Sequence, residues 1–75
     1  MNKPILAVII PCYNEELCVK KTAETLLALL DKLVEKEKIS EESYLYFVDD
    51  GSKDKTWNII VSLHQQDKRV KALKF

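Results

Sequence analysis

An unbroken apolar run near the start of the chain does most to limit the possible folds. The residues from Ile5 to Ile10 are all apolar, and most of them are β-branched. A strand with one wet face normally alternates apolar and polar residues, whereas a strand covered on both faces of a parallel sheet does not. Pro11 follows the run and is expected to end it. The run therefore predicts a buried strand in a parallel sheet.

A helical pattern follows this strand. From about Glu15 to Lys36, apolar residues recur at spacings of three and four, with charged residues on the other face. Asn14 is the expected N-cap of this helix, and Glu15 and Glu16 suit its first turn because they complement the helix dipole.

Two further strands and a second helix complete the pattern. Strands are expected over residues 44–48 and 70–75, and the second helix is expected to start near Asp54. One stripe of this helix is expected to carry Trp57, Ile60, Val61 and His64, with Ile59 and Leu63 beside it. His64 lies too far along the helix to reach the loops at its start, so a structural role is expected for it.

The element order predicts a three-stranded parallel βαβαβ unit of the α/β class. Right-handed crossovers in sequential strand order place both helices on the same face of the sheet. The other face, built partly from Ile5 to Ile10, would then meet water. We expect either that these residues are the first part of a larger sheet or that the chain self-associates to cover this face.

The composition limits the possible functions. The chain has 75 residues, with 12 basic and 12 acidic side chains, and this balance argues against a nucleic-acid partner. No apolar run approaches the ~20 residues of a membrane-spanning helix, so a cytoplasmic location is expected. The single glycine, Gly51, excludes the glycine-rich phosphate loops. Cys12 and Cys18 match no redox or zinc pattern and are expected to be reduced thiols.

Polar residues follow two neighbouring strands at the point where each strand ends. Asp49 and Asp50 come directly after the second strand, and a loop containing Tyr13 and Glu15 follows the first. Open α/β sheets bind ligands at the carboxyl ends of their strands. Tyr13 offers a ring for stacking on a base, a carboxylate such as Asp50 can accept N–H groups, and backbone groups at Pro11 and Val48 can complete a pocket. The alternative is that the two aspartates only form a turn and cap the next helix; the matching first loop favours a small-molecule site. Asp49 and Ser52 are expected to hold the loop.

Two segments carry a family resemblance. Residues 8–16 (VIIPCYNEE) and 47–56 (FVDDGSKDKT) resemble the amino-terminal part of family 2, GT-A-fold glycosyltransferases, and in particular the dolichyl- and polyprenyl-phosphate sugar transferases such as bactoprenol glucosyltransferases. The resemblance implies that residues 1–75 are one partial, Rossmann-like GT-A domain. It also implies a parent enzyme that transfers a hexose from a UDP- or GDP-sugar, with polyprenyl phosphate at the inner membrane face as acceptor. The nucleotide-binding positions fall on five residues: Pro11, Tyr13, Glu15, Val48 and Asp50.

The family's metal-binding Asp-x-Asp motif does not occur in these residues. By resemblance the parent uses Mg²⁺ or Mn²⁺ against the donor diphosphate, but Asp49 and Asp50 are adjacent and do not fit that motif. We therefore expect no metal ligand, no catalytic residue and no sugar transfer from this chain alone. The alternative function is a non-catalytic remnant that binds nucleotide weakly or serves only as a packing module.

Overall fold

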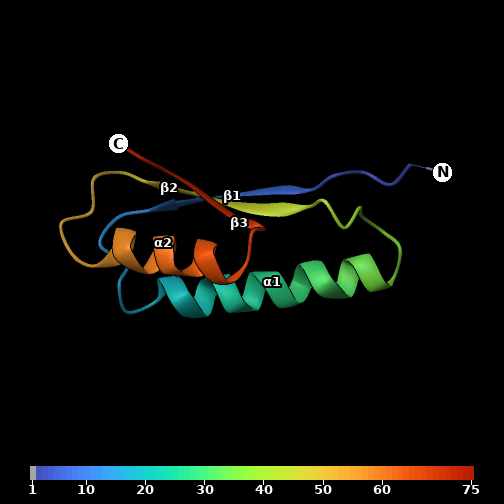
Figure 1. Cartoon of the computed structure of the whole chain (residues 1–75), viewed down its shortest axis with the longest axis horizontal. Helices are drawn as coiled ribbons and strands as arrows, with labels where there is room; N and C mark the ends of the chain where they lie inside the picture. Colours follow the sequence, from blue (N-terminus) through green and yellow to red (C-terminus); the bar gives the residue numbers. More distant parts are fainter. Residues whose placement is uncertain (1) are drawn as a thin grey trace.

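A computed structural model describes residues 2–75 and shows three strands alternating with two helices (Figure 1). The elements in chain order are β1 (Ala7–Cys12), α1 (Val19–Glu35), β2 (Tyr44–Asp49), α2 (Thr56–Gln66) and β3 (Val70–Lys74). The strands form one parallel sheet in the order β1-β2-β3. The predicted βαβαβ unit is therefore confirmed.

The core lies between the sheet and the two helices. Leu45 and Phe47 of β2 are fully buried there, against Leu30 of α1, Ile60 of α2 and Val70 of β3. Residues of β2 alternate between this core and the far face of the sheet, as the period of a strand requires. The central strand thus contributes the largest core side chain, Phe47.

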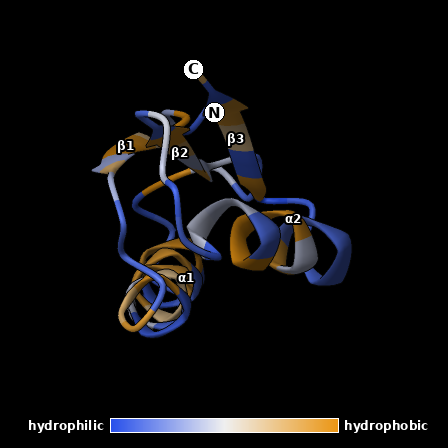
Figure 2. Cartoon of the chain, turned by 90° about the vertical axis from the view of Figure 1, so that its left-hand side faces the viewer, coloured by the Kyte–Doolittle hydropathy of each residue, from blue (hydrophilic) through white to orange (hydrophobic). Residues whose placement is uncertain are grey.

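Both helices cover the same face of the sheet, as predicted, and the other face is open. Figure 2 shows the strands above α1 and α2, with none of the described chain on their far side. Ile9 is 59% exposed on that face, next to its register partner Tyr46. We call the exposed far side of the sheet the open face; it consists of Ala7, Ile9, Pro11, Tyr44, Tyr46, Val48, Lys71 and Leu73.

Pro11 does not end the first strand, which continues to Cys12. The carbonyls of Leu6 and Cys12 accept hydrogen bonds from Tyr44 and Asp50 of the neighbouring strand. Because alternate residues of a parallel strand bond to the same side, the nitrogen of Pro11 faces the unpaired edge of β1. A proline is tolerated there because the sheet needs no N–H at that point.

The predicted start of the first helix was also wrong. α1 begins at Val19 with Cys18 as its N-cap, and no side chain caps it. The amides of Cys18 and Val19 both bond to the carbonyl of Glu15, so a separate turn precedes the helix. Asn14 precedes this turn and Glu16 lies within it, and the amides of Asn14, Glu15 and Glu16 bond to side chains described below.

The buried stripe of α2 differs from the predicted one. Thr56, Ile60 and Leu63 are its buried residues, whereas Val61 and His64 are exposed. α2 packs against both α1 and the sheet, and its buried stripe is therefore turned toward Leu63. The Nδ1 atom of His64 lies 2.6 Å from the carbonyl oxygen of Val70, which is consistent with a structural role.

One ion-pair cluster joins α1 to the turn before β3. Arg69 donates two hydrogen bonds to the carboxylate of Asp67 and a third, 2.6 Å long, to Asp31 of α1. The hydrogen bonds from Arg69 hold the pKa of the Asp67 carboxyl below its usual value. None of the helices among residues 2–75 is long and apolar enough to cross a membrane.

The open face leads us to expect self-association of the chain. Replacing Ile9 by lysine places a charge among the exposed apolar side chains of this face, so Ile9→Lys should reduce association without touching the core. Leu29→Lys is the matched control, since Leu29 is 47% exposed on the outside of α1. Light scattering over a concentration series measures the effect. A wild-type chain that stays monomeric and binds no apolar dye would contradict the expectation.

Candidate functional site

Two loops leave the sheet side by side at its carboxyl edge. Loop 1 (residues 13–18) follows β1, and loop 2 (residues 50–55) follows β2. Both lie at the left of Figure 1, away from the N-terminus. The amide of Asp50 donates to the carbonyl of Cys12 over 2.9 Å, so the pairing of the strands continues into the loops. This edge is where open α/β sheets bind ligands.

Three consecutive amides of loop 1 bond to side chains that follow β2. Asn14 N–H donates to Ser52 Oγ (2.9 Å), and Glu15 N–H donates to Thr56 Oγ1 (2.7 Å). Glu16 N–H donates to Asp54 Oδ2 (3.3 Å). We call this set of three hydrogen bonds the clasp. It explains the spacing of Ser52, Asp54 and Thr56, because each supplies one acceptor to loop 1.

Asn14 ties the loops together from the other side. Its Oδ1 accepts the amide of Lys53 over 2.9 Å. Its backbone has φ 51°, a left-handed conformation that asparagine tolerates better than most residues. Asn14 therefore serves as a tie between the loops, where the sequence had suggested a helix cap.

Asp49 holds loop 2 in place, as predicted. Its fully buried carboxylate accepts the amide of Ser52 at Oδ1 over 2.8 Å. Gly51, at φ 78°, makes the intervening turn. The second oxygen, Oδ2, is buried and has no hydrogen-bond partner among residues 2–75. Asp49 thus orients Ser52, which in turn binds loop 1.

All five residues predicted to bind a nucleotide lie at this carboxyl edge. Pro11 and Val48 are register partners on the open face, and Asp50 is exposed directly beyond them. Tyr13 is 52% exposed in loop 1. Glu15 borders a cavity of about 110 Å³ that Pro11 of β1 and Val19 of α1 also line.

The polar groups of these residues are free to meet a ligand. None of the hydrogen bonds or ion pairs formed within the described chain uses the side chain of Tyr13, Glu15 or Asp50. A carboxylate is an acceptor only, so Glu15 and Asp50 suit a ligand that presents N–H or O–H groups.

Cys12 is buried close to the acidic residues Glu15 and Asp49. Burial raises the pKa of its thiol to about 11, and the nearby charges of Glu15 and Asp49 act in the same direction. At neutral pH the thiol is protonated, so it is a poor nucleophile.

The end of the last strand lies beside loop 2, which was not predicted from the sequence. The amide of Phe75 donates to the carbonyl of Asp49 over 3.0 Å, and the carbonyl oxygen of Phe75 lies 3.9 Å from where a Cβ of Gly51 would be. The end of β3 therefore reaches loop 2. The roles of Asp54 and Thr56 toward loop 1 were also missed, since no local pattern marks a contact between two loops.

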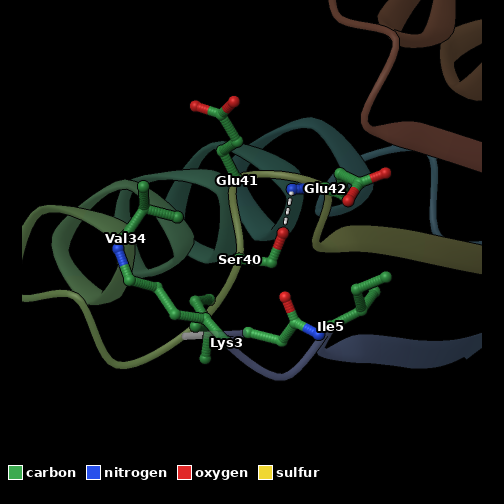
Figure 3. Close-up of a pocket in the computed structure, with 8 residues that line it drawn as sticks. Lys3, Ile5, Val34, Ser40, Glu41 and Glu42 are labelled. Carbon is green, nitrogen blue, oxygen red and sulfur yellow. Dashed lines mark hydrogen bonds between the residues drawn. The ribbon is translucent and has the colours of Figure 1, made fainter.

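Another hollow lies at the opposite edge of the sheet. It has a volume of about 600 Å³ and lies between the residues before β1 and the loop before β2 (Figure 3). Figure 3 shows the carboxylates of Glu41 and Glu42 pointing away from Lys3. Ligands of open α/β sheets bind at the carboxyl ends of the strands, whereas this hollow is at the amino ends. We therefore do not assign it as the site.

Comparisons with known proteins decide the family. The model of Glycosyl transferase family 2 matches residues 7–75. The chain belongs to this family. It is 41% identical over 73 residues to the uncharacterized glycosyltransferase YkoT of Bacillus subtilis (strain 168), an alignment that covers 97% of this chain and 22% of YkoT. It is 36% identical over 70 residues to the uncharacterized glycosyltransferase YkcC of the same organism, covering 92% of this chain and 20% of YkcC.

The glycosyltransferase fragment thus spans about a fifth of the length of these relatives. The family match supports the predicted GT-A type of front half for the βαβαβ unit, and it begins at the first residue of β1. Both segments that carried the resemblance, residues 8–16 and 47–56, fall within the match. The comparisons establish the family and name no branch, donor or acceptor.

The two cysteines should differ sharply in reactivity. Cys12 is buried with a pKa of about 11, whereas Cys18 is exposed at the end of loop 1. At pH 8 iodoacetamide should modify Cys18 and leave Cys12 intact until the chain is unfolded. Peptide mass spectrometry of native and urea-treated samples measures this. Equal labelling of both thiols under native conditions would show that loop 1 does not pack as described.

The Asp54 contact to loop 1 should be lost in acid. Burial acts to raise the pKa of Asp54, but hydrogen bonds from Thr56 and Glu16 outweigh it and hold this pKa below its usual value. A carboxyl whose pKa falls on folding stabilises the fold above its unfolded pKa of about 3.9, and that contribution is lost as pH falls through the folded value. A carbon-detected NMR titration should give a lower midpoint for Asp54 in the folded chain than in urea. An equal midpoint would contradict the contact.

Proposed function

We propose that this chain is the nucleoside-binding part of a glycosyltransferase that uses a UDP- or GDP-hexose. The observation that carries the proposal is the position of Asp50. Its unpaired carboxylate lies at the carboxyl edge of the sheet, beside Pro11 and Val48 and across from the clasped loop 1. Family membership supplies the reaction class, and the free acceptors supply the reason to place the base here.

The chemistry of the three free side chains fits a nucleoside. Uracil and guanine both carry ring N–H groups, which a carboxylate such as Asp50 can accept. Tyr13 offers an exposed aromatic ring on which a base can stack. Glu15, in loop 1, can accept a ribose hydroxyl or a further N–H.

The acceptor that we propose is a polyprenyl phosphate at the cytoplasmic face of the membrane. Support for this part comes from the resemblance of residues 8–16 and 47–56 to polyprenyl-phosphate sugar transferases. In the whole enzyme, residues outside this chain would bind the acceptor and complete the site.

A divalent cation does not fit the residues described here. In family 2 we expect Mg²⁺ or Mn²⁺ against the donor diphosphate, yet no group of three or more His, Cys, Asp or Glu side chains in residues 2–75 could hold a metal ion. The free oxygen of Asp49 is buried among residues of the helix side rather than at the open face. We propose that the metal ligands, and sugar transfer itself, belong to the rest of the parent enzyme.

One observation favours a second candidate function, a non-catalytic packing module. The open face carries exposed apolar side chains, including Ile9 and Leu73, which a partner surface would cover. In that case nucleotide binding would be weak or absent. A nucleotide titration distinguishes the two candidates directly.

Removing the Asp50 carboxylate should abolish most nucleotide binding. A hydrogen bond to a charged group contributes about 1.5–3 kcal/mol, so Asp50→Ala should weaken UDP or GDP binding by roughly 10- to 100-fold. Calorimetry gives the affinity, and amide NMR spectra with UDP and then GDP locate the site. The perturbed amides should lie in residues 12–16 and 48–52.

Glu41→Ala is the matched control, because Glu41 is an exposed acid that lines the hollow at the opposite edge. It should bind nucleotide as the wild type does, as should His64→Ala. Equal affinity of the wild type and Asp50→Ala would refute the site. No response of the wild type to either nucleotide would favour the packing module.

A further inference from the structure

Two of the three side chains in the clasp, those of Ser52 and Thr56, are buried from any ligand. Thr56 is completely buried, and Ser52 is 8% exposed. Both hydroxyls are engaged within the chain. The Oγ1 of Thr56 accepts the amide of Glu15 and donates its own hydrogen to Asp54, while Ser52 Oγ accepts the amide of Asn14. These residues therefore act on the site, if at all, through loop 1.

The clasp fixes the two peptide planes on either side of Asn14. The hydrogen bond to Ser52 sets the direction of the N–H between Tyr13 and Asn14, and the bond to Thr56 sets that between Asn14 and Glu15. Asn14 is held in a left-handed conformation at φ 51° between them. The directions in which Tyr13 and Glu15 leave the backbone follow from these planes.

The same residues connect loop 1 to Asp50. Ser52 is held by Asp49, the neighbour of Asp50, through a 2.8 Å hydrogen bond. The amide of Asp50 is bound to Cys12, immediately before loop 1. These bonds fix the backbone positions of Tyr13, Glu15 and Asp50 relative to one another, although the three residues come from two loops. Preorganisation of this kind lowers the cost of ordering side chains on binding.

We propose that Thr56 and Ser52 are positioning residues of the nucleotide site. Each holds an amide of loop 1 so that Tyr13 and Glu15 face the same ligand as Asp50. The proposal rests on the proposed function, because it concerns nucleotide binding at that edge. It assigns no contact between these hydroxyls and the nucleotide.

Three variants of the 75-residue chain test the role of Thr56. Thr56→Val keeps the shape and removes both hydrogen bonds of the hydroxyl, whereas Thr56→Ser keeps the hydroxyl. Thr25→Val is the control, since Thr25 is exposed on α1. Calorimetry with UDP or GDP, whichever the wild type binds, gives the affinity of the folded chain. Amide hydrogen exchange reports whether the N–H of Glu15 is still bound.

Thr56→Val should weaken nucleotide binding about tenfold and speed exchange at Glu15, and Thr56→Ser should restore both to within about twofold of the wild type. Thr25→Val should change neither. A purely structural threonine would lower the melting temperature of Thr56→Val and leave its nucleotide affinity unchanged, and that result would overturn the proposal. So would failure of Thr56→Ser to restore affinity while it restores protection at Glu15.

Ser52→Ala provides a second test if Thr56→Val does not fold. It should free the amide of Asn14 and weaken binding several-fold, and unchanged affinity with a freed Asn14 amide would overturn the proposal. The outcome for the proposed function is separate. If the wild-type chain binds neither UDP nor GDP, the proposed function fails first and the positioning role fails with it; if the wild type binds and the variants bind equally, only the positioning role fails.

Discussion

The capture of three loop 1 amides by side chains of the segment after β2 is the interaction on which the site depends. Backbone N–H groups removed from water must be paired, and loop 1 has no regular secondary structure to pair them. Ser52, Asp54 and Thr56 provide the acceptors instead. As a result, the two loops form one surface, although each belongs to a separate crossover connection. α1 then begins at Val19, after the turn that follows Glu15.

Much of the fold was predictable because its elements are long and strongly patterned. The β-branched run of β1 and the apolar spacing of α1 each indicate one element, and the crossover rule then places both helices on one face. The ends of the elements were less predictable. Pro11 looked like a terminator because sequence does not reveal which way its nitrogen faces at an edge strand. The buried stripe of α2 was predicted incorrectly because packing against α1 turns the helix. The sequence of one helix does not show which other helix it packs against.

The position of the candidate residues at the carboxyl edge was predictable from sequence because strand ends mark the ligand edge of an α/β sheet. Their supporting contacts were not found. Asn14 before two glutamates is typical of a helix N-cap, and its side chain does accept an amide, but that amide belongs to Lys53 in the other loop. A cross-loop bond between residues 39 positions apart leaves no local pattern. The same holds for Thr56, whose hydroxyl could as well have capped its own helix.

The clasp also limits which part of a nucleotide-sugar this edge can recognise. Free backbone amides in a loop commonly bind phosphate, but those of Asn14, Glu15 and Glu16 are already bound to side chains. The free carboxylates nearby are those of Glu15 and Asp50, which repel a diphosphate and attract N–H and O–H donors. Under the proposed function, the part of the edge beside these carboxylates therefore binds the base and ribose, and the diphosphate lies away from them.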